Sequence, residues 1–412
     1  MNLLFIGGLF SKEQEKQVLK YSKYMPNFAA NVHQWNIIKG LKMDVSIINP
    51  LFLGNYPNEY RKAFIKKEIW SHDGKAVNIS PSTVNIFGLK QIFRFFSIKK
   101  EIVKWMKYHD PKDSLIVIYS MNSSFISSFL SANKKNKTKF KSCLIVPDLP
   151  FFYIKNKGKN GLYRFLKTRD WNHMLKQTKN IDSFVLLTDQ MRGMLGVNGK
   201  PYLVCEGIAP SSYAECVPIV KNTITYTGTL DEEFGILDLI EAFLLCNRKD
   251  WVLRIAGDGN AHQAVAMASM KNSNVKYLGV LSNNDTRQIQ SSSYLLVNPR
   301  KSNEEFTKYS FPSKTMEYLI SGRPILMYKL QGIPDEYDKY LYYFDGLDIE
   351  SMSRKLKEIM DKPETELFTI GKRGKSFVEN EKSVDAQGSK LSLFFEKIVA
   401  ESFGASKEKK HE

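Results

Sequence analysis

The feature that most constrains the fold of this chain is an alternation of short apolar runs with longer segments of helical periodicity. Strands that alternate with helices form parallel sheets covered on both faces. The predicted strands are 2–6, 44–48, 114–119, 142–146, 183–188 and 202–204 in a first series, and 223–227, 251–256, 275–278, 293–298 and 324–328 in a second. Two such series predict an α/β protein with two doubly wound, Rossmann-like domains.

The domain boundary is expected where Pro, Ser and Gly cluster, at 206–222. A chain of 412 residues also exceeds what one hydrophobic core usually serves. We expect a first domain over 1–205 and a second over 206–379. A last helical segment, about 375–401, lies beyond the second series, and its part from about 380 to 401 is expected to complete the first domain. Two such domains would direct the carboxyl ends of both sheets to a common cleft, where small ligands bind.

Composition excludes several classes of protein. The hydrophobic fraction of 43% is that of a packed globular chain, and no apolar run approaches the ~20 residues that span a bilayer. The first residues, MNLLFIGGLF, have the pattern of a strand and turn rather than of a signal peptide. The four cysteines lack C-x-x-C spacing, which favours a reduced cytoplasmic protein with inert, buried thiols.

A net charge of +17 indicates an anionic partner or a lysine-rich, soluble surface. Basic clusters occur at 134–141, 155–160 and 407–412, and solubility is the simpler explanation for the last of them. Anionic lipid and a phosphorylated substrate both fit such a surface. Nucleic acid is not expected as a partner, because zinc-finger spacing, an RNP-like aromatic strand and a long basic helix are all missing from the sequence.

The stretch YSFPSKTMEYLISGRPIL, residues 309–326, predicts a helix and then a strand. Pro312 sets the first turn, and Gly322 ends the helix. The amides of Ser313 and Lys314 therefore lack partners within the helix, and such a helix start binds anions. The sequence predicts an anion site at this helix.

Lys314 stands where the helix dipole disfavours a cation by ~0.3–1 kcal/mol, and a bound anion would remove that conflict. Glu317 shares its face of the helix and is suited to bind a pair of sugar hydroxyls. An ordinary Lys314–Glu317 surface pair explains the same residues equally well. Arg300 follows a predicted strand and is suited to phosphate, although pairing with Glu304 or Glu305 is the alternative.

Five segments of the second series together resemble the retaining family-four enzymes, glycosyltransferase group 1, among the GT-B glycosyltransferases. The segments are YTGTLDEEFGILDLIEAF (226–243), RIAGDG (254–259), KYLGVLSNND (276–285), LLVNPR (295–300) and FPSKTMEYLISGRPIL (311–326). The first half matches more loosely, through Gly7-Gly8 and IVPDLP (145–150). The chain is most similar to enzymes that assemble capsular or other exopolysaccharides on a lipid carrier.

The resemblance implies a site for a nucleotide sugar and one for an acceptor. It places Glu317 on the ribose and the amides of Ser313 and Lys314 on the diphosphate. It places Gly8, Gly228 and Thr229 along the same pocket, and the backbone of Gly279 and Val280 near the base. It places Asp148 at the acceptor or the reacting sugar. Asp148, Arg300 and Lys314 are the expected catalytic residues.

The chain departs from the family pattern at four positions. Tyr309 stands where the family has Glu, Thr229 and Phe234 where it has Arg and Lys, and Pro147 where it has His. One explanation is that Arg300 and Lys314 supply the cations for the departing diphosphate from elsewhere. The other is that catalysis is lost, which would make the chain a non-catalytic GT-B subunit that binds or stabilises a partner transferase.

The expected reaction is transfer of a hexose-type sugar from a nucleoside diphosphate, a UDP-sugar, to a lipid-linked oligosaccharide or polysaccharide acceptor. The resemblance implies retention of the anomeric configuration, without a metal ion or another cofactor. An epimerase would need further acid and base residues, and the sequence offers no such set. His33 is the one histidine that we consider for the acceptor site, although a structural or exposed position is the more ordinary expectation.

Two segments, 89–109 and 151–171, interleave aromatic residues with Lys and Arg. Such segments can lie on an anionic bilayer, with aromatic rings in the interface and cations at the headgroups. For 89–109, a core-facing helix with a basic outer side is an equally good explanation. We expect a cytoplasmic protein that binds peripherally at the inner face of the cell membrane.

Overall fold

The structure is a computed structural model, which describes residues 1–24, 28–136, 138–155, 161–209, 217–302 and 305–408. The chain divides into two compact units, Met1–Glu206 with Val384–Glu412 and Gly207–Ser383. The predicted boundary was 205/206. Each unit is described here by itself.

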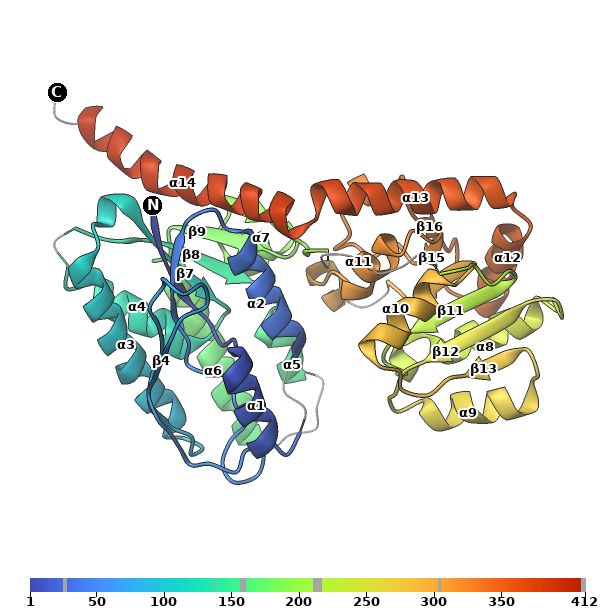
Figure 1. Ribbon diagram of the computed structural model, residues 1–412, viewed down its shortest axis with the longest axis horizontal. Coiled ribbons are helices and arrows are strands. Elements are labelled where there is room, and N and C mark those ends of the chain that lie inside the picture. Colours follow the sequence, from blue (N-terminus) through green and yellow to red (C-terminus); the bar gives the residue numbers. More distant parts are fainter. Residues whose placement is uncertain (25–27, 137, 156–160, 210–216, 303–304, 409–412) are drawn as a thin grey trace. The chain divides into compact units, whose positions relative to one another are not determined.

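The first unit is built on an eight-stranded sheet of order β10-β9-β8-β7-β1-β2-β5-β4 (Figure 1). Its strands are β1 (Asn2–Ile6), β2 (Asp44–Ile48), β4 (Glu68–Trp70), β5 (Asn78–Ser80), β7 (Ser114–Tyr119), β8 (Lys141–Val146), β9 (Ser183–Leu186) and β10 (Tyr202–Val204). They pair in parallel, except β4 with β5. A separate antiparallel pair joins β3 (Phe64–Ile65) and β6 (Thr83–Val84).

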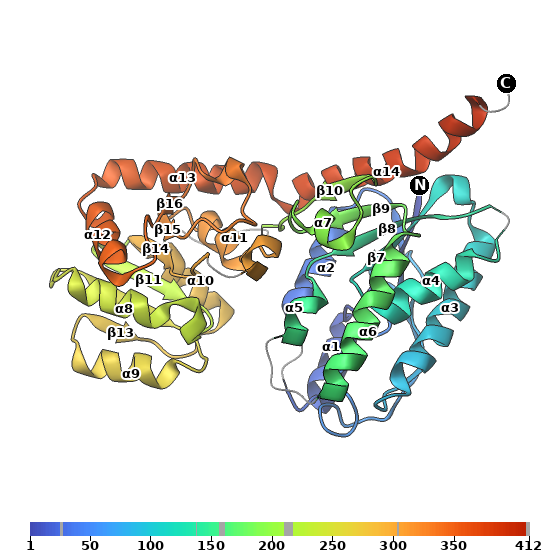
Figure 2. The same cartoon turned by 180° about the vertical axis from the view of Figure 1, so that it is seen from behind.

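Helices cover both faces of this sheet. They are α1 (Lys12–Tyr21), α2 (Phe28–Gly40), α3 (Lys90–Tyr108), α4 (Ser123–Asn133), α5 (Pro150–Lys155), α6 (Gly161–Thr178), α7 (Met191–Leu195) and α14 (Val384–Glu408), with a 3₁₀ turn at Pro111–Asp113. α4 packs between α3 and α6 on one face, and α2 packs with α14 on the other (Figure 2). β7 is buried along its whole length, as expected for a central parallel strand.

The packing of α2 on α14 depends on a close approach of two glycines. A side chain at Gly388 would overlap the backbone of Gly40, and a side chain at Gly40 would overlap the carbonyl of Val384. The Lys42 amide also donates to the hydroxyl oxygen of Ser392, 3.1 Å away. These contacts bind the last helix of the chain to the first unit.

The second unit is built on a six-stranded parallel sheet of order β13-β12-β11-β14-β15-β16. Its strands are β11 (Thr223–Thr227), β12 (Val252–Ala256), β13 (Val275–Tyr277), β14 (Leu295–Asn298), β15 (Ile325–Met327) and β16 (Tyr342–Tyr343). Its helices are α8 (Ile236–Leu245), α9 (His262–Lys271), α10 (Asn283–Ser291), α11 (Ser313–Ile320), α12 (Ile349–Met360) and α13 (Glu364–Glu381), with 3₁₀ turns at Glu232–Phe234, Glu305–Tyr309 and Asp335–Tyr337.

The predicted strands all occur, with ends that differ by at most two residues. The predicted last helix over about 375–401 is wrong as a single element. α13 ends at Glu381 and α14 begins at Val384, because the chain leaves the second unit and enters the first between them. In the described part of the chain, none of the helices combines the length and the apolar character that crossing a bilayer requires.

Candidate functional site

The second unit has its topological switch point between β11 and β14. From β11 the chain proceeds outward to β12 and β13, and it then returns to β14 on the other side of β11. Ligands of open α/β sheets bind at the carboxyl ends of strands at such a point. Gly228 follows β11, Arg300 follows β14, and α11 begins at Ser313. These are residues that the sequence singled out, and we call this region the switch-point site.

The Lys314 ammonium lies beside the end of β11. It donates to the hydroxyl oxygen of Tyr226 at 3.3 Å, and it lies 4.9 Å from the centroid of the same ring. A side chain at Gly228 would coincide with this ammonium. Gly228 also has a φ of +146°, which disfavours any residue with a Cβ. The glycine therefore provides the space in which Lys314 lies.

Arg300 contributes the second cation of the switch-point site. Its guanidinium lies between two aromatic rings, 4.7 Å from the centroid of Phe234 and 4.7 Å from that of Phe306. Burial, and to a smaller extent the positive charge of Arg300, lower the pKa of Lys314 to about 8. The two positive charges repel each other, and a bound anion would relieve this repulsion.

Glu317 lies one turn beyond Lys314 on α11, and burial raises the pKa of its carboxyl. Lys314, a hydrogen bond from Gln290 and the charge of Arg287 act in the opposite direction. The amide nitrogen of Gln290 also donates to the hydroxyl oxygen of Thr227 at 2.9 Å. Glu317 is thus a half-buried carboxylate beside Lys314. An ordinary surface ion pair would be solvated and would not need this burial or the contact with Gln290.

The remaining predicted donor residues border the same strand ends. Ser313 and Thr229 are exposed, and the exposed fraction of Val280 is 73%. The carbonyl of Gly279 accepts from the Gly257 amide at 2.8 Å, which ties the end of β13 to that of β12. Gly279 and Val280 thus follow β13, at the same edge of the sheet as the switch-point site, and their expected contact with the base stays a prediction.

The first unit holds the other two predicted residues, Gly8 and Asp148. The Gly8 amide donates to the side-chain oxygen of Gln34 at 2.9 Å. A side chain at Gly8 would overlap the ring of Phe52, which itself stacks on Phe125 at 5.5 Å. Gly8 is thus buried beneath Phe52, and its expected contact with the donor stays a prediction.

Asp148 is half-buried after β8, and its charge acts on Tyr119 at the end of β7. Burial and the Asp148 charge raise the pKa of Tyr119. The rings of Tyr119 and His33 are 5.8 Å apart, and burial lowers the pKa of His33 to about 4. His33 is consequently a neutral base near pH 7. The sequence analysis did not single out Tyr119, which appears there only as the last residue of an apolar strand.

Comparison with known proteins bears on both units. No curated protein matches the chain. Among solved structures, a sucrose-phosphate synthase from Thermosynechococcus elongatus is 11% identical with a TM-score of 0.62, over 97% of this chain and 100% of that one. An α,α-trehalose 6-phosphate synthase from Burkholderia multivorans is 10% identical with a TM-score of 0.63, over 98% of both chains. A pneumococcal O-GlcNAc transferase in complex with UDP and GlcNAc is 9% identical with a TM-score of 0.55, over 97% and 99%.

These neighbours are GT-B glycosyltransferases with two Rossmann-like domains. At such low identities the likeness establishes the fold, over nearly the whole chain. Residues 221–362 also match the family model of the glycosyl transferases group 1. The second unit is thus similar to the glycosyl transferases group 1 over residues 221–362, and we call this segment the group 1 domain. The predicted resemblance to GT-B enzymes of that group is confirmed.

The group 1 domain contains contacts that the sequence analysis missed. Tyr226 and Gln290 hold Lys314, Thr227 and Glu317, yet in the sequence both residues have the pattern of ordinary strand and helix positions. Phe234 was noted only as a departure from the family lysine, whereas the structure shows it stacked on Arg300. The sequence did contain a signal for this contact, because Phe234 replaces the family lysine and Arg300 follows β14.

Proposed function

We propose that this protein transfers a hexose-type sugar from a nucleoside diphosphate, with UDP-sugars as the expected donors, to a saccharide or lipid-linked saccharide acceptor. The observation that carries the proposal is the convergence of Lys314, Arg300 and Glu317 at the switch point of a group 1 domain. Retention of the anomeric configuration and independence of metal ions belong to the same proposal.

The two cations suit the departing diphosphate. Charge develops on the leaving group in the transition state, and donors fixed in advance at that place stabilise it most. Lys314 is held against Gly228, and Arg300 is held between two rings, so both are ordered before the ligand arrives. A diphosphate between them would return the pKa of Lys314 toward its ordinary value. In this scheme protein cations provide the charge that a metal ion supplies in other transferases.

The departures from the family pattern are compatible with this scheme. The ring of Phe234 supports Arg300 by a cation–π contact. The residue that replaces the family lysine thereby fixes a different cation near the site. This contact favours relocation of the charge over loss of catalysis.

The roles of Glu317 and Asp148 complete the proposal. Glu317 would accept hydrogen bonds from the ribose hydroxyls. Asp148 would orient the acceptor hydroxyl, and the leaving diphosphate would take the acceptor proton on the face that it leaves.

The resembled enzymes suggest a biological place for the reaction. We assign the protein to the assembly of capsular or other exopolysaccharides, at the cytoplasmic face of the cell membrane. Its surface would bind there peripherally, close to a lipid-linked acceptor. The net charge of +17 supports contact with anionic lipid.

A thermal-shift screen of nucleoside diphosphates and nucleotide sugars tests the proposal. A true donor at a hundredfold over its Kd stabilises the fold by ~2.7 kcal/mol. Lys314→Gln and Arg300→Gln should each weaken that response by at least tenfold in Kd. Lys301→Gln is the matched control on the same loop, because Lys301 pairs with Asp238 at 2.6 Å and is not assigned to the site.

Slow hydrolysis of the stabilising nucleotide sugar by the purified protein distinguishes an enzyme from a binding subunit. We expect hydrolysis that Arg300→Gln abolishes. Nucleotide binding without hydrolysis or transfer would support the non-catalytic alternative. Equal responses of the parent and of both site variants would contradict the diphosphate site itself.

A further inference from the structure

In its first three turns, helix α3 buries charged side chains and exposes apolar ones, which is the reverse of the usual pattern. Lys90 and Arg94 are buried, whereas Ile92, Phe93 and Phe96 are exposed, with 62% of Phe96 open to solvent. A surface helix normally buries its apolar stripe and exposes its charges. The sequence-based alternative of a core-facing helix with a basic outer side is therefore wrong for this part of α3.

Specific hydrogen bonds keep the cations inside. The Lys90 ammonium donates to the Leu53 carbonyl, and Arg94 donates to the Leu51 carbonyl at 3.1 Å. Burial lowers the pKa of Lys90 to about 8 and that of Arg94 to about 10. The helix cannot rotate to bury its aromatic face without breaking these bonds. The exposed aromatic side chains are thus a fixed feature of the fold.

The exposed stripe of α3 changes from apolar to basic along the helix. Leu89, Phe93 and Phe96 follow a spacing of four and three residues, which places them on one face. Lys100 and Lys107 continue the same face and are exposed. Phe87 in the preceding turn is also largely exposed. An apolar end beside a row of lysines is the pattern of an interfacial helix on anionic lipid.

The helix α6 repeats this arrangement. Its buried residues, Trp171, Met174 and Thr178, all lie in its second half. The first half exposes Leu162, Phe165 and Leu166 among basic residues, with 62% of the Phe165 side chain open to solvent. Two helices of the same unit therefore leave aromatic and aliphatic side chains uncovered at their amino-terminal ends.

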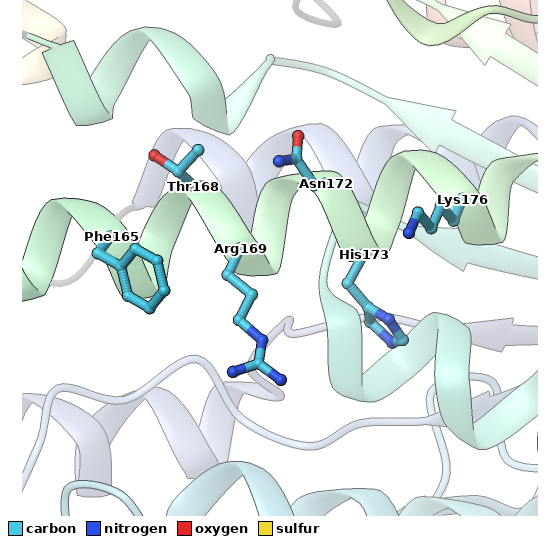
Figure 3. A pocket seen from close by; sticks show the side chains of 6 residues that line it. All are labelled: Phe165, Thr168, Arg169, Asn172, His173 and Lys176. Carbon is cyan, nitrogen blue, oxygen red and sulfur yellow. The ribbon is translucent and has the colours of Figure 1, made fainter.

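An open pocket of about 490 Å³ runs along α6 (Figure 3). It is lined by Phe165, Thr168, Arg169, Asn172, His173 and Lys176. Phe165, Arg169 and His173 extend from the same side of the helix in Figure 3. An aromatic ring followed by cationic and hydrogen-bonding groups suits the boundary between the acyl chains and the phosphate of a lipid.

The amino-terminal ends of α3 and α6 lie at the same end of the first unit, the lower end in Figures 1 and 2. We propose that this end is a membrane-docking surface, formed by Phe87, Leu89, Phe93 and Phe96 of the α3 region and Leu162, Phe165 and Leu166 of α6, and that its partner is a bilayer rich in anionic phospholipid. The inference rests on the proposed peripheral location and names the surface responsible. The aromatic and aliphatic side chains enter the interface, while Lys100 and Arg169, which follow them on the two helices, contact the phosphates.

Co-sedimentation of the full chain with phosphatidylcholine vesicles, with and without phosphatidylglycerol, tests this surface. Strong binding is expected only with the anionic lipid, and it should weaken as salt is raised. Lys100→Gln with Arg169→Gln should reduce the affinity roughly thirtyfold, since each basic residue near the surface contributes a factor of about five. Phe93→Ser with Phe96→Ser should abolish sedimentation with either vesicle.

Met270→Ser with Lys271→Gln is the matched control. This pair belongs to α9 in the second unit, where Met270 is 86% exposed beside an exposed lysine. The control should bind vesicles as the parent does. If it loses binding equally, or if the α3 variants bind as the parent, the proposed surface is overturned.

Two further readouts distinguish a membrane-docking surface from a dimer interface and from the donor site. Gel filtration of the lipid-free parent should show a monomer, and a dimer that Phe93→Ser with Phe96→Ser dissociates would assign the surface to a second copy of the chain instead. Nucleotide thermal shifts should be unchanged in all of these variants. The donor site and the membrane surface can then fail independently.

Discussion

The Lys314 ammonium occupies the space that a side chain at Gly228 would fill. The two residues are 86 positions apart in the chain, and they meet because α11 begins beside the end of β11. Each of them has an ordinary local role, as a turn glycine and a helix residue. Together they place a cation at the switch point of the sheet.

This relationship predicts that Gly228→Ala impairs nucleotide binding. The methyl group displaces Lys314, and the φ of +146° adds ~1–3 kcal/mol of strain. We expect at least a tenfold increase in the Kd for UDP, measured by calorimetry. Gly74→Ala is the control, because Gly74 has a φ of +82° and nothing within 4 Å of an added Cβ. An unchanged Kd in Gly228→Ala would show that Lys314 does not contact the nucleotide.

The lowered pKa of Lys314 predicts that nucleotide affinity depends on pH. The free protein holds this ammonium charged below about pH 8 and neutral above it. A diphosphate favours the charged form, so the affinity should fall as the pH rises from 7 to above 9. Lys314→Gln should remove this dependence and bind weakly at every pH. An equally steep profile in the variant would assign the titration to another group.

The same pKa predicts an effect on stability without ligand. Its value in the folded protein lies below the ordinary 10.5, so between about pH 8 and 10.5 the unfolded chain binds more protons. Burial of charged Lys314 therefore lowers the free energy of unfolding, and this effect is fully present below about pH 8. The destabilisation disappears as the pH rises from about 8 to 10.5. Lys314→Gln should stabilise the apo protein on the order of 1 kcal/mol at pH 7, after allowance for partial exposure. Urea unfolding at pH 7 and pH 10.5 checks the sign.

Glu317→Gln tests the ribose assignment. Loss of a charged acceptor for the ribose hydroxyls should weaken UDP binding by ~1.5–3 kcal/mol, or about tenfold to a hundredfold. Binding of 2′,3′-dideoxy-UDP should already be weak and should change little. Equal losses for the two nucleotides would mean that Glu317 acts through Lys314 rather than on the sugar.

The close approach of Gly388 to Gly40 predicts a local effect on the first unit. Gly388→Val would force α14 away from α2, at a cost of ~1–3 kcal/mol or more. Lys390→Val is the control for the helix propensity of valine, because Lys390 is exposed on the same helix. Chemical unfolding gives the stabilities of both variants. A similar loss in the two would show that the glycine contact contributes little, and nucleotide binding should persist in either case.

Local patterns were sufficient to predict most of the elements. Parallel strands such as β7 are buried on both faces, so the sequence shows them as continuous apolar runs. Pro312 and Gly322 mark the two ends of α11 through their own backbone preferences. The sequence also predicted the anion-binding character of that helix start, since unpaired amides follow from helix geometry alone.

Orientation about a helix was not determined by the pattern. The pattern of 89–109 predicted either a helix on a bilayer or a core-facing helix with a basic outer side. The structure buries Lys90 and Arg94 because carbonyls of the neighbouring loop accept from them. Local sequence does not contain that loop contact.

The sequence by itself determined the α/β class, and it singled out the candidate residues Arg300, Lys314 and Glu317. Only the tertiary structure decided that Arg300 stacks on Phe234 and that Lys314 lies against Gly228. The physical reason is that an element's own residues set its form through short-range sterics and apolar periodicity. Contacts between distant residues depend on the order of strands in the sheet, and that order results from packing of the whole unit.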